Sequence, residues 1–146
     1  PRGNAEAEVA ALCQTVPGVL KLGFVNDAEL RWLYGHAAGF VLPSLLEGFG
    51  VPALEAGRRG VVPLVSAGGA LEEAVGSGGV AVDPESVTAI GDGLRRLIDM
   101  SDEERTQRLA QLSAHAATLS RGRYLKHWSE VLSRNAGTQR LGDEHE

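Results

Sequence analysis

Two glutamates and two glycines lie close together in the segment P-S-L-L-E-G-F-G-V-P-A-L-E, which covers residues 43–55. Glu47 and Glu55 are eight positions apart, and Gly48 and Gly50 lie between Glu47 and a proline. Carboxylates accept hydrogen bonds from sugar hydroxyls. A proline suits the first position of a helix, where unpaired backbone N–H groups bind anions such as phosphate. The segment therefore predicts a phosphate site between two hydroxyl acceptors, which is the chemistry of a nucleotide-sugar site.

These residues need a strand before them and a helix after them. Residues 39–42 are a short apolar run bounded by glycine and proline, which is typical of a strand. Pro52 is expected to open a helix that ends near Gly60. In the turn between them, Gly48 and Gly50 are both expected to adopt backbone conformations closed to residues with a Cβ.

Strand and helix signals alternate along the rest of the chain. Further strands are expected at residues 19–25, 61–66 and 79–82. Further helices are expected over residues 5–15, from Asn26 or Asp27 to Ala37, after Gly69, from Ser86 to Ile98, from a Ser101–Glu104 capping box, and over residues 124–132. This alternation predicts an α/β fold, a Rossmann-like parallel sheet with helices on both faces. Ligands bind such sheets at the carboxyl ends of the strands, where the turn at residues 44–51 follows its strand.

Composition limits the classes of function. The 146 residues are enough for one domain with a core, and no apolar run is long enough to span a membrane. A net charge of −5 argues against nucleic acid as a partner. Cys13 is the single cysteine, which excludes an internal disulfide and a cysteine-based metal site. We expect one domain over residues 1–134 and a disordered polar tail over residues 135–146.

The segment at residues 43–55 resembles the E-x7-E signature of retaining glycosyltransferases of the GT-B fold. Residues 22–30 are similar to a strand-then-helix segment of that family. Downstream, the similarity continues through Gly60, Pro63, Ser66, a G-G-x-x-E pattern that ends at Glu72, and the V-D-P run at residues 82–84. The resemblance covers residues 17 to 100. It implies the C-terminal, nucleotide-sugar-binding half of a GT-B fold, without the first strands of that domain.

The resemblance also implies a role for individual residues. The implied donor-binding residues are Glu47, Gly48, Phe49, Gly50, Val51, Glu55, Val25 and Leu30. Glu47 is the implied catalytic residue and would orient the donor sugar through its hydroxyls. The backbone N–H groups of residues 49–51 would meet the sugar and the distal phosphate, and Glu55 would accept hydrogen bonds from the ribose. Val25 would line the base pocket with Leu30 packed nearby.

The implied reaction moves a sugar from a nucleotide-diphosphate sugar to an acceptor hydroxyl with retention of the anomeric configuration. It needs no metal and no cofactor beyond the nucleotide sugar, and the chain contains no D-x-D motif. The implied partners are the missing N-terminal GT-B domain and an acceptor that is a glycan, a lipid or a small molecule, with no nucleic acid. The implied location is the cytoplasm or the inner face of the membrane. The nucleotide base, the sugar and the acceptor stay open.

Several alternatives stay open as well. The family places an arginine and a lysine near the start of this domain to neutralise the donor pyrophosphate, and residues 1–21 contain no match to that segment. Since the implied N-terminal acceptor domain is missing as well, we expect this chain to be inactive alone. The alternative function is a non-catalytic or split-enzyme subunit that docks on a separate acceptor-domain partner. Phe49 is either a packing anchor or a substrate platform, and Glu72 is either a helix cap or a functional residue.

Overall fold

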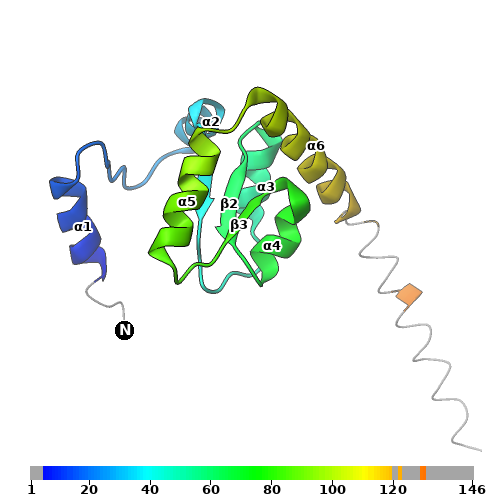
Figure 1. The fold of residues 1–146 in the computed structure, drawn as a ribbon, viewed down its shortest axis with the longest axis horizontal. Helices are drawn as coiled ribbons and strands as arrows, with labels where there is room; N and C mark the ends of the chain where they lie inside the picture. Colours follow the sequence, from blue (N-terminus) through cyan, green and yellow to red (C-terminus); the bar gives the residue numbers. More distant parts are fainter. Residues whose placement is uncertain (1–4, 120–121, 123–128, 131–146) are drawn as a thin grey trace, which may run out of the picture. The chain divides into compact units, whose positions relative to one another are not determined.

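The computed structural model describes residues 5–119, 122 and 129–130 (Figure 1). By its internal contacts the chain divides into two compact units, residues 1–33 and residues 34–146, and each is described by itself. Only residues 129–130 of the helix predicted over 124–132 are described, and they are helical. The tail predicted over residues 135–146 lies outside the described residues. One domain over residues 1–134 therefore stays a prediction.

The first unit contains helix α1 (Ala5–Thr15) and most of α2 (Asp27–His36), which crosses into the second unit. Asn26 fixes the start of α2, because its Oδ1 accepts hydrogen bonds from the N–H groups of Ala28 at 2.9 Å and Glu29 at 3.0 Å. In return, Oε2 of Glu29 accepts a hydrogen bond from the N–H of Asn26 at 2.8 Å. This reciprocal pair is a capping box. It confirms the predicted helix start and selects Asn26 as the cap.

The strand predicted over residues 19–25 is wrong, because no residue between the first unit's two helices belongs to a strand. Gly23, with a φ of 68°, interrupts the run, and Leu20 and Phe24 are exposed. A strand is held by hydrogen bonds to a neighbouring strand, and no described residue pairs with this segment. An apolar run without a pairing partner does not form a strand. The described residues therefore form three strands, where four were expected.

The second unit is built on a parallel sheet in the order β1-β2-β3, with β1 at Phe40–Leu42, β2 at Pro63–Ser66 and β3 at Val80–Val82 (Figure 1). The register aligns Val41 with Leu64 and Val65 with Ala81. Pro63 lies in the central strand, but at its first residue, where the missing N–H is tolerated. The predicted strands at residues 39–42, 61–66 and 79–82 are confirmed.

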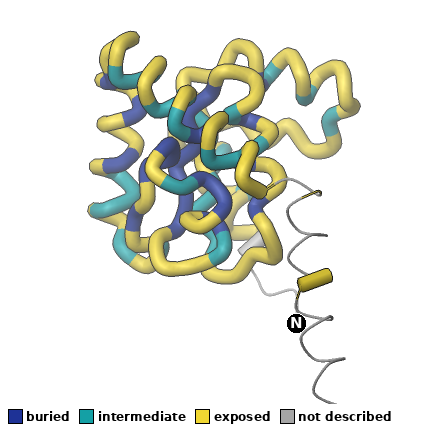
Figure 2. Tube along the Cα trace, turned by 90° about the vertical axis from the view of Figure 1, so that its right-hand side faces the viewer, coloured by how far each residue is buried: buried dark blue, intermediate teal, exposed yellow. Residues whose placement is uncertain are grey.

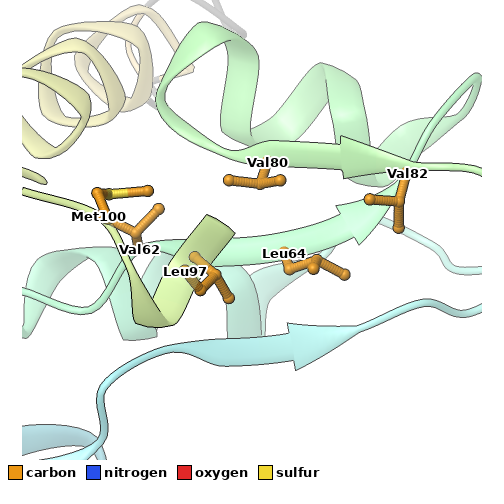
Figure 3. Packing of buried hydrophobic residues seen from close by; sticks show 6 residues of the cluster. All are labelled: Val62, Leu64, Val80, Val82, Leu97 and Met100. Atoms are coloured by element: carbon orange, nitrogen blue, oxygen red, sulfur yellow. The ribbon is translucent and has the colours of Figure 1, made fainter. Parts of the chain in front are cut away.

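Helices cover both faces of this sheet. They are α3 (Val51–Arg58), α4 (Ala70–Val75) with the short 3₁₀ helix η1 (Gly76–Gly78), α5 (Val87–Ile98) and α6 (Asp102–Thr118). On one face, Leu97 of α5 and Met100 pack with Leu64 and with side chains of β3 (Figure 3). On the other face, Val65 packs with residues of α3, α4 and α6. Successive residues of a strand point to opposite faces, so the alternation along β2 produces both layers. The predicted α/β class is confirmed.

Every residue of β2 is buried, and Figure 2 shows the buried positions in the interior of the second unit.

The start of α6 follows only half of the predicted capping box. The Ser101 hydroxyl accepts the N–H of Glu104 at 3.1 Å, but the Glu104 carboxylate instead accepts hydrogen bonds from Arg108 at 2.8 Å and Arg96 at 3.1 Å. Arg108 also donates to the carbonyl of Gly79 at 2.8 Å. These contacts fix α6 against the sheet, and the candidate site lies at the carboxyl ends of the strands of this sheet.

Candidate functional site

The turn between β1 and α3 follows the carboxyl end of β1 directly, as the sequence predicts. Ser44 lies at the start of the turn, and Ser66 is the last residue of β2. The Ser66 hydroxyl, which is buried, donates a hydrogen bond to the backbone carbonyl of Ser44 at 2.6 Å. The carboxyl ends of neighbouring parallel strands lie at one edge of a sheet, and this hydrogen bond joins the two ends directly. The candidate turn is therefore tied to the buried central strand.

Glu47 is exposed within this turn. The Ser44 hydroxyl donates a hydrogen bond to Oε1 of Glu47 at 3.1 Å. In the part of the chain that the structure describes, no other hydrogen bond or ion pair is found for this carboxylate. An exposed carboxylate with one oxygen held by a serine can accept further hydrogen bonds from a ligand hydroxyl.

Gly50 is a position where the fold requires glycine. Its φ is 77° in the left-handed region, and it forms the N-cap of α3. Its carbonyl accepts the N–H groups of Ala53 at 3.0 Å and Leu54 at 3.3 Å. A Cβ at this buried position would lie 2.7 Å from Cδ2 of Leu71 in α4. The prediction for Gly50 is confirmed by both the backbone conformation and the packing.

The same prediction is wrong for Gly48. This residue does not have a positive φ, and a Cβ built on it would meet nothing within 4 Å. The reason is that the left-handed conformation is needed only once in the turn, at the residue that begins α3. The protein's own fold therefore accepts a side chain at position 48.

The start of α3 presents backbone donors. The helix begins at Val51, one residue earlier than expected, so Pro52 is its second residue and not its first. Within the described residues, the N–H groups of Phe49, Gly50 and Val51 find no hydrogen-bond acceptor. Together with the aligned peptide dipoles of α3, three unpaired N–H groups make a favourable location for an anion. The side chain of Phe49 is 49% exposed, which leaves both of its predicted roles open.

Glu55 lies in α3 and is exposed. Its charge acts on Tyr34, a buried residue of α2 whose ring packs on Phe40 with centroids 5.8 Å apart. Burial raises the pKa of the Tyr34 hydroxyl, the negative charge of Glu55 raises it further, and the positive charge of Arg59 opposes both. Sequence reasoning assigned Tyr34 only to the apolar stripe of its helix. Its position in that stripe gave no signal that the fold brings it near Glu55.

Val25 and Leu30 belong to the first unit, whereas the turn at residues 44–51 belongs to the second. Val25 is half-buried and lines a hollow of about 360 Å³. The lining residues are Leu22, Phe24, Val25, Glu29, Trp32 and Leu33. Leu30 is half-buried but does not line the hollow, and its N–H bonds to the carbonyl of Asn26 at 2.9 Å in the first turn of α2. Five of these six lining residues are apolar, and Glu29 is charged.

Glu72 of α4 accepts a hydrogen bond from the N–H of Gly68 at 2.6 Å. This contact supports its reading as a local cap of the loop before α4. Among the residues that the structure describes, no cluster of three or more histidine, cysteine, aspartate or glutamate side chains could hold a metal ion. No helix in that same part of the chain is long and apolar enough to cross a membrane.

This chain is similar in sequence to one family model and to several known proteins. Residues 7–114 match the family model described as "Glycosyl transferases group 1". The chain is 48% identical to the O-antigen chain mannosyltransferase B of Escherichia coli over 69 residues, which are 47% of this chain and 18% of that protein. It is 39% identical to the serotype-specific mannosyltransferase WbdA of Escherichia coli over 100 residues, 67% of this chain and 11% of that protein. It is 36% identical to the MMP alpha-(1->4)-mannosyltransferase of Mycolicibacterium hassiacum over 104 residues, 69% of this chain and 24% of that protein.

A solved structure shows a similar fold. The alpha,alpha-trehalose 6-phosphate synthase of Burkholderia multivorans matches with a TM-score of 0.75 at 14% identity, over 100% of this chain and 36% of that chain. At this identity the likeness shows the fold alone. The chain spans between 11% and 24% of the length of the three mannosyltransferases, so it corresponds to a small part of each.

Proposed function

This chain belongs to the glycosyl transferases group 1 family, and from that membership we propose that it is the donor-binding part of a retaining glycosyltransferase. The predicted GT-B kind of fold is confirmed by the likeness to the trehalose-phosphate synthase. The proposed reaction moves a sugar from a nucleotide-diphosphate sugar to an acceptor hydroxyl. Because the relatives above are named as mannosyltransferases, a nucleotide-activated mannose is the donor that we propose first.

One observation carries this proposal. Three unpaired backbone N–H groups at the start of α3 lie in the chain between two exposed glutamates, Glu47 and Glu55. The N–H groups would donate hydrogen bonds to the distal phosphate, and Glu47 would accept hydrogen bonds from the hydroxyls of the donor sugar. Glu55 would accept hydrogen bonds from the ribose. Within the first unit, we propose that Val25 lines the base pocket with Leu30 packed nearby.

We propose that Gly48 has a role in donor binding, although the fold does not require glycine there. Since a Cβ at position 48 meets nothing within 4 Å, the protein itself does not require glycine there. A donor that approaches the backbone of the turn closely would require it. We therefore assign Gly48 to the close approach of the sugar or phosphate.

The contribution to catalysis that we propose for the start of α3 is electrostatic. When the acceptor hydroxyl attacks the anomeric carbon, the bond to the diphosphate breaks, negative charge develops on the leaving oxygens, and the proton of the acceptor hydroxyl passes to the leaving diphosphate. Fixed N–H dipoles at the start of α3 would stabilise this charge without reorganisation. No metal is proposed for this step. The acceptor, whether a glycan, a lipid or a small molecule, would be held by the N-terminal domain of the full protein, so we expect these 146 residues alone to bind donor without turnover.

Calorimetric binding of nucleotides to this chain tests the proposal. The probes are UDP, GDP and ADP with their sugar conjugates, GDP-mannose included, and the variants are Glu47→Ala and Glu55→Ala. We expect one base to be preferred, Glu55→Ala to weaken every ligand with that base, and Glu47→Ala to weaken only the sugar conjugate. Glu103→Ala, which removes an exposed glutamate at the start of α6, is the matched control. A folded chain that binds none of the probes would contradict the proposal.

A further inference from the structure

A chain of two hydrogen bonds connects the buried sheet to Glu47. Ser66 at the end of β2 donates its hydroxyl to the carbonyl of Ser44 at 2.6 Å, and the Ser44 hydroxyl donates to Oε1 of Glu47 at 3.1 Å. The two serines are 22 residues apart in sequence, and neither is among the residues assigned to donor binding. The first link fixes the backbone of the turn, and the second fixes the side chain.

The two links differ in burial. Ser66 is 5% exposed, Ser44 is half-buried and Glu47 is exposed, so the order runs from the core to the surface. A buried hydroxyl with a satisfied hydrogen bond has a defined position, because leaving it or its acceptor unpaired is costly. A free glutamate side chain, by contrast, samples several rotamers and loses entropy when a ligand orders it. A glutamate that is held in advance loses less.

We propose that Ser44 and Ser66 are positioning residues that hold Glu47 in the orientation in which it accepts hydrogen bonds from the donor sugar. Ser66 sets the place of Ser44, and the Ser44 hydroxyl occupies one carboxylate oxygen of Glu47. The second oxygen, for which the described residues supply no partner, then accepts the sugar hydroxyl. The inference rests on the proposed function of Glu47 and adds what orients it.

The test separates the sugar-dependent part of binding from the rest. This part is the ratio of the dissociation constants of a nucleotide diphosphate and its sugar conjugate, measured with GDP and GDP-mannose and with UDP and UDP-glucose. The variants are Ser44→Ala, Ser44→Thr, Ser66→Ala, Glu47→Ala and the double variant Ser44→Ala with Glu47→Ala. Ser113→Ala, on the exposed side of α6, is the control.

Ser44→Ala is expected to reduce this ratio by about three- to tenfold, the usual value of one hydrogen bond, and to leave the affinity for the diphosphate unchanged. Ser44→Thr, which keeps the hydroxyl, should retain the ratio, and Ser66→Ala should reduce it in the same direction. In the Glu47→Ala background, Ser44→Ala should change nothing further, because residues that act as one unit are not additive.

Three results distinguish the failures. If Glu47→Ala removes the sugar-dependent ratio but Ser44→Ala does not change it, the positioning role is wrong and the proposed function stands. If Ser44→Ala weakens diphosphate and conjugate equally, its role is only to support the turn, and the positioning role is again wrong. If Glu47→Ala has no effect, or no probe binds, the proposed function is wrong. NMR relaxation of the Glu47 side chain then still tests the positioning role. Ser44→Ala should make this side chain more mobile, and Ser44→Thr should not.

Discussion

Gly50 lies so close to Leu71 that a Cβ at position 50 would be 2.7 Å from the Leu71 Cδ2 atom. This contact joins the residue before α3 to α4, the next helix along the chain. It means that α4 holds the start of α3 at a fixed place, and with it the three backbone N–H groups that we assign to phosphate binding. The left-handed φ of 77° and the close contact are independent requirements for glycine at one position.

Gly50→Ala should therefore destabilise the second unit. The left-handed conformation and the overpacking against Leu71 together cost about 2–4 kcal/mol in the free energy of unfolding. Urea denaturation followed by circular dichroism measures this change. Equal stabilities of Gly50→Ala and wild type would contradict the described packing at the start of α3.

Gly48→Ala is the matched variant in the same turn, and it separates fold from function. Its free energy of unfolding should stay within about 0.5 kcal/mol of wild type, since a Cβ there meets nothing and φ is not positive. Its affinity for the nucleotide-sugar donor should nevertheless fall, because the added methyl occupies space proposed for the donor. Unchanged donor affinity in calorimetry would remove Gly48 from the site.

Tyr34 reports on the charge of Glu55. Burial raises the pKa of the Tyr34 hydroxyl above 10.0, and Glu55 adds to that rise while Arg59 opposes it. Glu55→Gln should therefore lower the pKa of Tyr34, and Arg59→Gln should raise it. Ultraviolet absorbance of tyrosinate against pH, in a Tyr124→Phe background, measures both. Glu72→Gln is the control. If Glu55→Gln leaves the pKa of Tyr34 unchanged, Tyr34 and Glu55 are not neighbours.

Glu104 gives a pH dependence to the stability of the second unit. The hydrogen bond from Arg108, with a second from Arg96, holds the pKa of the Glu104 carboxyl below its ordinary value of 4.5. A carboxyl with a lowered pKa in the folded state stabilises the fold above its unfolded pKa, and this contribution disappears as pH falls through the folded value. Wild type should thus be more stable than Glu104→Gln at neutral pH. The difference should shrink below about pH 4.5 in denaturant titrations, and a constant difference at all pH values would contradict it.

Local signals in the sequence predicted most of the second unit. The helix that begins after Ser86 and the helix that begins after Ser101 were placed correctly, because a serine cap and an apolar period of 3.6 are properties of a few neighbouring residues. Residues 19–25 failed for the opposite reason. A strand depends on a partner elsewhere in the chain, and apolar content alone does not supply one.

The candidate site shows the same division. The sequence identified the turn, and the E-x7-E resemblance named its residues, but it treated Gly48 and Gly50 alike. Only the approach of α4 and the start of α3 distinguish them. The link from Ser66 to Ser44 could not be predicted either, since it joins two strand ends 22 residues apart. The effect of the Glu55 charge on Tyr34 could likewise not be predicted, because the two residues are 21 positions apart in sequence.

The start of α3 is the proposed binding site of the donor diphosphate. A two-dimensional NMR titration of the ¹⁵N-labelled chain with the nucleotide-diphosphate sugars tests this site residue by residue. We expect the amide signals of Phe49, Gly50 and Val51 to move most, and inorganic diphosphate to move the same signals at higher concentration. Saturating shifts confined to other residues, with these three amides unmoved in a folded chain, would contradict it.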